Sequence, residues 1–190
     1  MTAAGERRRR QYTGGIAAIV AAAAAALAVP SGCGIVEDVL DPVHSREIAA
    51  LGDDPSGART GPTHRAGQPC LVCHGSAGPN HPEFSVAGTV YRTQTTAEAL
   101  QGAVVTLTDA EGAMRQIDTN RTGNFYVEAG AWQPVYPMRV SVSSGGVTTD
   151  MKTHVGREGS CATCHTDPSG PASAGHVYLV ADPATFPGQP

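Results

Sequence analysis

The sequence predicts a mainly β protein, a small antiparallel sandwich of seven strands flanked by two irregular segments. Glycine and proline make up about a fifth of the 190 residues, so long helices cannot dominate the chain. From residue 85 onward, short runs of β-branched and apolar residues alternate with turn-forming residues. Seven such strands without a long helix are typical of an antiparallel sandwich.

Turn residues separate the expected strands, with tight connections favoured at residues 110–112, 121–123 and 144–146. Before residue 70 we expect one short helix, which Asp41 can cap, Pro42 can begin and Gly52 can end. The expected strands are Val86–Thr93, Ala103–Asp109, Met114–Thr119, Asn124–Glu128, Tyr136–Ser143, Val147–Lys152 and Val177–Ala181.

The N-terminus has the order of a secretory signal peptide. Arg7 to Arg10 form a positive region, and an apolar run at residues 16–29 precedes Pro30-Ser31-Gly32. The run is too short to span a relaxed bilayer, and a single transmembrane anchor is the alternative. We therefore expect the mature chain outside the cytoplasm, exported by the general route.

Cys33 follows this segment directly, after two small residues. This order resembles the lipobox of bacterial lipoproteins, although Pro30 stands where leucine is usual. The resemblance implies lipid attachment at Cys33 and a place in the bacterial cell envelope, in the periplasm or at the outer membrane. The alternative is cleavage near Ala28, which would leave a free reactive thiol at Cys33.

These observations divide the chain into five parts. They are a signal peptide (1–32), a tether with one short helix (33–69), a first motif segment (70–84), the sandwich (85–153) and a second motif segment with the last strand and tail (154–190). From Cys33 onward there are nine Lys and Arg residues against 16 Asp and Glu, a net charge of −7. Phosphate affinity depends on Lys and Arg, so nucleic acid is excluded as a partner, and basic proteins fit better.

Three phrases within residues 85–150 resemble the carboxypeptidase regulatory-like domain of prealbumin type. They are Gly88-Thr89-Val90-Tyr91, residues 102–109 followed by Gly112, and residues 119–125. The resemblance implies a seven-stranded Greek-key sandwich without catalytic residues. The resemblance concerns the fold only, so any indication of function must come from the flanking segments.

Those segments carry two copies of one motif, Cys70-Leu71-Val72-Cys73-His74 and Cys161-Ala162-Thr163-Cys164-His165. Two thiols three residues apart on one turn can each bond to a porphyrin vinyl group, and the following histidine can then reach the iron. The motif resembles the attachment site of c-type cytochromes. The resemblance implies two covalently attached haem c groups, tethered by the four cysteines and ligated by His74 and His165.

Other uses of paired cysteines fit less well. A Cys₄ zinc site usually has its pairs ~15–20 residues apart, whereas these pairs bracket a whole domain. A thioredoxin-like pair needs a βαβ setting that the sequence lacks. Structural disulfides suit an exported chain, but they do not explain a histidine after both pairs.

The sequence leaves the sixth ligand of each iron open. A histidine precedes and another follows each motif, and a methionine lies ten residues before the second one. Methionine ligation raises the reduction potential relative to two histidines, so the choice sets the chemistry. The candidates are His64, His81, Met151, His154 and His176.

The sequence thus predicts an exported dihaem c-type cytochrome, an electron carrier rather than an enzyme, that passes single electrons between redox partners, expected to be other cytochromes. Because an even number of strands, six, is expected between the motifs, both haems should lie at one end of the sandwich. One alternative is a haem enzyme or gas sensor with an open axial site, although no Arg and His pairing is recognisable near either motif. Another is a surface binding module, whose candidate aromatics are Tyr126, Trp132 and Tyr136.

Overall fold

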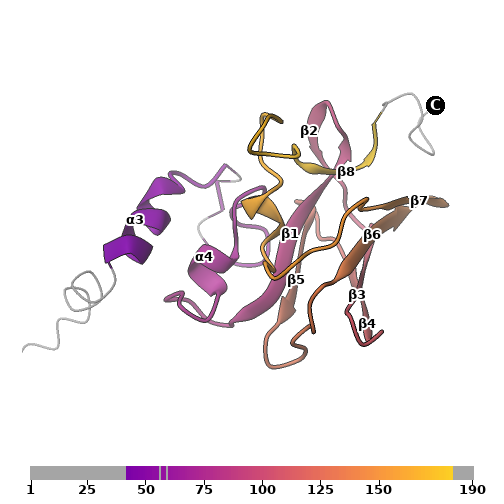
Figure 1. Cartoon of the computed structure of the whole chain (residues 1–190). Coiled ribbons are helices and arrows are strands. Elements are labelled where there is room, and N and C mark those ends of the chain that lie inside the picture. Colours follow the sequence, from indigo (N-terminus) through magenta and orange to yellow (C-terminus); the bar gives the residue numbers. More distant parts are fainter. Residues whose placement is uncertain (1–41, 56, 59, 182–190) are drawn as a thin grey trace, which may run out of the picture. The chain divides into compact units, whose positions relative to one another are not determined.

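A computed structural model describes residues 42–55, 57–58 and 60–181, and it is mainly β, with eight strands in two sheets (Figure 1). The predictions for residues 1–32, for Cys33 and for the Asp41 cap lie outside the described residues. The helical elements are α3 (Pro42–Ala50), α4 (Leu71–His74) and the 3-10 turn η1 (Cys161–Thr163). No helix in this part of the chain is long and apolar enough to cross a membrane.

Seven of the eight strands lie where the sequence predicts them. The strand β2 was not predicted, because its residues lack the β-branched and apolar alternation of the others. The strand β6 begins later than predicted, since Pro137 has no N–H to donate to a ladder. The strands are β1 (Phe84–Thr93), β2 (Thr96–Ala99), β3 (Val104–Thr108), β4 (Met114–Asp118), β5 (Asn124–Glu128), β6 (Arg139–Ser144), β7 (Val147–Asp150) and β8 (Val177–Val180).

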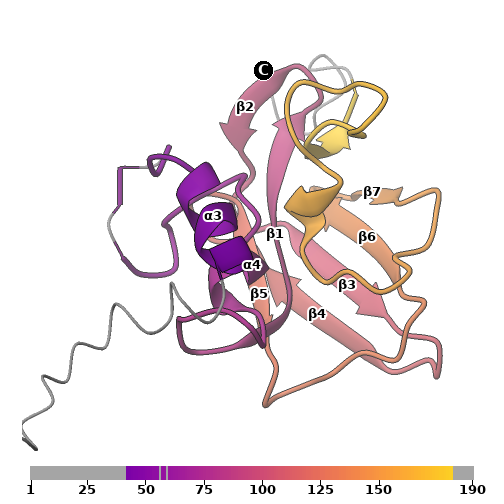
Figure 2. The same ribbon diagram turned by 60° about the vertical axis from the view of Figure 1, so that its left-hand side comes forward.

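The strands form two sheets, which Figure 2 shows as separate layers. One has the order β4-β3-β6-β7 and is antiparallel throughout. The other has the order β2-β1-β5, with β8 also paired to β1. The β8 strand runs parallel to β1, with Val90 opposite Val177, so this sheet is mixed and the prediction of purely antiparallel pairing was wrong. A parallel neighbour requires a long crossover, which the second motif segment supplies.

The core consists of the side chains that alternate inward from the two sheets. Val105 and Leu107 of β3 are fully buried, as are Val86 and Val90 of β1. Met138 is only 1% exposed and belongs to this core. Burial of these apolar groups away from water is the main stabilising contribution to the fold.

The strand β1 is buried on both faces from Ser85 to Val90. One face contributes Val86 and Val90 to the core, while Thr89 accepts a hydrogen bond from the backbone of Gly67, in the segment before the first motif. Its Ala87 amide donates to the carbonyl of Gly159, in the segment before the second motif, at 2.9 Å. This strand therefore positions both motif segments.

Candidate functional site

The two motifs fold into the same tight turn. In the first, the amides of Cys73 and His74 donate to the carbonyl of Cys70 at 3.2 and 2.9 Å. In the second, the corresponding amides donate to the carbonyl of Cys161, again at 3.2 and 2.9 Å. All four motif cysteines are free thiols. Each pair is thus presented from one turn, as attachment of a single group to both sulfurs requires.

The motif histidines share a second feature, the hydrogen bond of one ring nitrogen. The Nδ1 atom of His74 lies 2.9 Å from the carbonyl oxygen of Pro82, and that of His165 lies 2.8 Å from the carbonyl oxygen of Gly175. A carbonyl only accepts, so Nδ1 donates and Nε2 keeps its lone pair. Metal-ligating histidines characteristically donate their other N–H in this way, which orients the ring.

Each motif lies on its own cavity. The first cavity has a volume of about 250 Å³ and is lined by both cysteines of the first motif, His74, His64 and the exposed His81. His74 is only 8% exposed and stacks on Phe84 with ring centres 4.4 Å apart. The His64 ring lies near the His74 ring, with the two ring centres 5.9 Å apart. Of the predicted sixth ligands, two therefore line the first cavity, and His64 is the one in contact with the motif histidine.

The sandwich holds His64 in this place through Asn124 of β5. The Asn124 side chain donates to the carbonyls of His64 at 3.0 Å and Pro62 at 3.3 Å, and it accepts from the Thr89 hydroxyl at 2.7 Å. That hydroxyl accepts from the Gly67 amide at 2.8 Å. The Nδ1 atom of His64 also contacts the Gly61 carbonyl. We did not identify Asn124 from the sequence, because the Pro62 and His64 carbonyls that it binds lie about 60 residues away.

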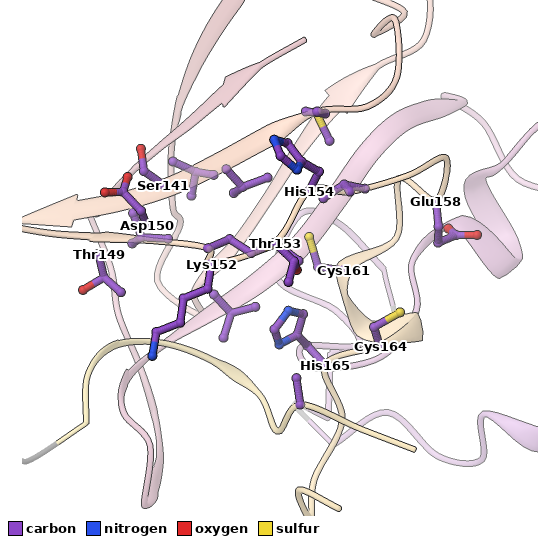
Figure 3. A pocket seen from close by; sticks show the side chains of 18 of the residues that line it. Ser141, Thr149, Asp150, Lys152, Thr153, His154, Glu158, Cys161, Cys164 and His165 are labelled. Atoms are coloured by element: carbon purple, nitrogen blue, oxygen red, sulfur yellow. The ribbon is translucent and has the colours of Figure 1, made fainter. Parts of the chain in front are cut away.

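The second cavity is larger, about 570 Å³, and is lined by Cys161, Cys164 and His165 (Figure 3). Its apolar wall includes Val105, Phe125 and Val142, which belong to the core between the sheets. Met151, His154 and His176 also line it, so all three remaining candidates are near the second motif. Figure 3 shows the His154 and His165 rings on opposite sides of Cys161.

His176 lines this cavity, but both of its ring nitrogens have other partners. Its Nδ1 atom lies 2.6 Å from the Asp167 carboxylate, and its Nε2 atom lies 2.8 Å from the Thr93 carbonyl. The ring is 8% exposed and packs against Tyr91 with ring centres 4.6 Å apart. These contacts anchor the start of β8 to β1 and leave no nitrogen of His176 free to act as a ligand.

His154 forms a pair with an arginine that the sequence analysis did not find. The Arg139 Nε–H donates to the His154 Nε2 atom at 3.3 Å. The two residues lie 15 positions apart, and pairing of β6 with β7 folds the chain back to bring them together. A third cavity of about 480 Å³ is lined by Arg139, His154, Met151 and Lys152, the last three of which also line the second cavity.

The two motif segments meet on β1. The Ala87 amide donates to the Gly159 carbonyl at 2.9 Å, and a side chain on Gly159 would lie 3.2 Å from Leu71 of the first motif. Seven strands, not six, separate the motifs, so the count behind the prediction was wrong. The segments still lie together, because the chain after β7 returns past Met138 to β1.

The two segments also have similar surroundings. The carbonyl of Cys73 accepts from the Asn80 amide at 3.0 Å, and that of Cys164 accepts from the Ala174 amide at 3.0 Å. Each loop then leads into a strand, β1 or β8, and these strands are parallel neighbours. In the sequence, this similarity appears only as the shared order of a histidine, the motif and a second histidine.

Burial raises the pKa of Cys70, Cys73 and Cys161. The pKa of Cys70 rises from 9.0 to about 11 and that of Cys161 from 9.0 to about 12, mainly because the thiolate would lose its hydration. The same cause raises the pKa of Cys73. Dithiol redox enzymes instead need a lowered thiol pKa, because the thiolate is the nucleophile. Within the described ranges, no three His, Cys, Asp or Glu side chains are grouped as ligands of a metal ion.

A comparison of the chain with protein families, with curated proteins and with solved structures finds no match. The resemblances to the carboxypeptidase regulatory-like domain, to c-type cytochromes and to bacterial lipoproteins therefore stay predictions from short motifs.

Proposed function

We propose that this chain is an exported dihaem c-type cytochrome that transfers single electrons between redox partners. The observation that carries the proposal is the matched chemistry of the two motifs. In each, two reduced thiols on one turn adjoin a histidine whose Nδ1–H is bound and whose Nε2 lone pair is free beside a cavity. This is the donor set that two covalently attached haem c groups require.

The residues present fit such a group. Cys70 and Cys73 would hold one haem, and Cys161 and Cys164 the other, with His74 and His165 as axial ligands. Two imidazoles on opposite sides of one metal ion have ring centres about 6 Å apart, since each metal–nitrogen bond is ~2 Å. His64 and His74 have this separation, which supports His64 as the second axial ligand at the first site. The bound haem iron supplies a one-electron redox couple whose potential depends on these ligands.

The sandwich would bring the two centres close together. The close packing is clearest at Gly88 of β1. A side chain at this position would lie 2.9 Å from the Cys161 sulfur and 3.0 Å from Phe125. Phe125 lines both cavities and is 2% exposed. A buried side chain shared by the two sites means that they are close together, which favours direct electron exchange between them.

Two features outside the site complete the proposal. The mature chain is acidic, which favours weak docking to basic redox partners such as other cytochromes. Lipid attachment at Cys33 would hold the protein at a membrane of the bacterial envelope.

The alternative of a surface binding module loses support from the placement of its aromatics. Trp132 is 8% exposed and belongs to the core, and Tyr136 is half-buried. Tyr126 is more exposed, but it stacks on Phe84 beside the first cavity, with ring centres 4.5 Å apart. These side chains do not form the exposed platform that a carbohydrate module needs.

The test is maturation in a host that attaches haem to polypeptides, followed by intact mass measurement. We expect a coloured protein with two haems per chain. The double variant Cys70→Ala/Cys73→Ala should carry one haem, and so should Cys161→Ala/Cys164→Ala. A colourless product, or one that binds zinc in place of haem, would overturn the proposal.

A further inference from the structure

The two centres differ in what occupies the side opposite the motif histidine. At the first, the His64 ring contacts the His74 ring, and its Nδ1 atom contacts the Gly61 carbonyl, which leaves Nε2 available as a ligand. The carbonyls of Pro62 and His64 accept from the buried Asn124 side chain, which fixes the backbone of the His64 loop beside the first motif.

The second centre lacks an equivalent ring. No ring contact joins His165 to another histidine or aromatic side chain among the described residues. His176 has both nitrogens engaged, and the Nε2 lone pair of His154 accepts from Arg139. The cavity beside His165 has about 570 Å³, against about 250 Å³ at the first centre.

The surroundings of the second cavity are suited to a small ligand that accepts hydrogen bonds. Lys152 and His154 line both this cavity and the adjoining third cavity of about 480 Å³, which Arg139 also lines. Asp150 lines both cavities and Glu158 lines the second, so the two cavities together carry two fixed cations, Arg139 and Lys152, and two carboxylates. Figure 3 shows Asp150 and Lys152 on one side of Cys161, with the Asp150 carboxylate and the Lys152 ammonium directed away from it.

We propose that His64 fills the sixth coordination position at the first haem, whereas the residues around His165 leave that position open to a small exogenous inorganic ligand, such as an anion, held beside Arg139 and Lys152. This inference rests on the proposed dihaem function. It gives the two centres different tasks. The first, with both axial positions filled from the chain, suits electron transfer alone, and the second suits electron transfer coupled to ligand binding.

The experiment uses the mature protein after its two haems have been confirmed by mass, so that failure of haem attachment is recognised separately. The oxidised protein is titrated with cyanide and the reduced protein with carbon monoxide, and absorbance and EPR spectra are recorded. We expect rapid binding of one ligand per chain. His64→Gly should raise this to two, while His81→Gly, at the other histidine of the first cavity, should leave it at one.

Arg139→Leu should weaken cyanide binding about tenfold, as expected for the loss of one hydrogen bond to a charged ligand. The control Arg115→Leu removes the same charge from the exposed strand β4 and should leave the affinity unchanged. Two ligands bound by the unchanged protein would overturn the assignment of His64. No binding would overturn the open position, and binding gained in Met151→Ala or His154→Ala would then identify the residue that fills it.

Discussion

Single side chains from the sandwich position the ligands that the short motifs cannot position themselves. Asn124 is the main example, because its amide joins the loop of His64 to β1 and β5 through Thr89. Asn124 is 6% exposed and Thr89 is 5% exposed, so neither can replace these bonds with water. Buried polar groups of this kind are costly when a partner is removed.

We therefore expect Asn124→Leu to lower the free energy of unfolding by about 1–3 kcal/mol, because it leaves the Thr89 hydroxyl without an acceptor and the His64 carbonyl without a donor. It should also disturb the EPR spectrum of the first haem, since the His64 loop loses its anchor. Urea unfolding and low-temperature EPR of the mature protein measure the two effects.

Thr119→Val is the matched control for this variant. Thr119 is 3% exposed and bonds to the backbone of Leu100 and Ala103, away from both motifs. It should cost similar stability while the EPR spectrum stays unchanged. If the two variants have the same spectrum as the unchanged protein, Asn124 has only a structural role.

Among the elements, β1 does the most for the site, because both motif segments lie against it. The close approach depends on glycine at two positions. At Gly88 a side chain would meet Cys161 and Phe125, and at Gly159 it would lie 1.9 Å from the Ser85 carbonyl oxygen. A backbone atom cannot move aside as a flexible side chain can.

Gly159→Ala should thus separate the second motif segment from β1 and lower the free energy of unfolding by about 1–3 kcal/mol, the usual cost of overpacking. The magnetic interaction between the two ferric haems should weaken in the same variant. Gly156→Ala, three residues earlier, has open space around the new methyl group and serves as the control. Equal stability of the two variants in urea would contradict the close packing of this segment on β1.

At the scale of the whole molecule, the buried thiols of Cys70 and Cys161 should make the stability of the haem-free chain depend on pH. The folded state keeps Cys70 and Cys161 protonated up to pKa values of about 11 and 12, whereas the unfolded thiols lose their protons near 9.0. Above pH 9 the folded state therefore binds more protons than the unfolded state, and stability falls as the pH rises.

We expect the reduced, haem-free chain to lose stability progressively between pH 9 and 12, measured by urea unfolding at each pH. The haem-bound protein should lose less, because its thioethers do not titrate. Burial also raises the pKa of Tyr91 and Tyr136, so ionisation of these side chains lowers the stability of both forms as the pH rises. The difference in stability between the two forms therefore measures the contribution of the thiols. Parallel curves for the two forms would show that the Cys70 and Cys161 thiols are not buried.

Local patterns were enough to predict much of this molecule. The alternation of residues such as Val105 and Leu107 predicted a strand, and the strand β5 has the predicted bounds. The five-residue motifs predicted the turn that presents the thiols and histidines together. These features depend on neighbours within a few positions, whose spacing the sequence shows directly.

The tertiary structure alone decided the rest. Met151, His154 and His176 were equivalent candidates by spacing, but hydrogen bonds to Arg139, Asp167 and Thr93 distinguish the histidines. The parallel pairing of β8 with β1 and the clamp of Asn124 on the His64 loop join residues about 60 to 90 positions apart. Such contacts depend on how the whole chain folds back on itself, so a local sequence pattern does not predict them.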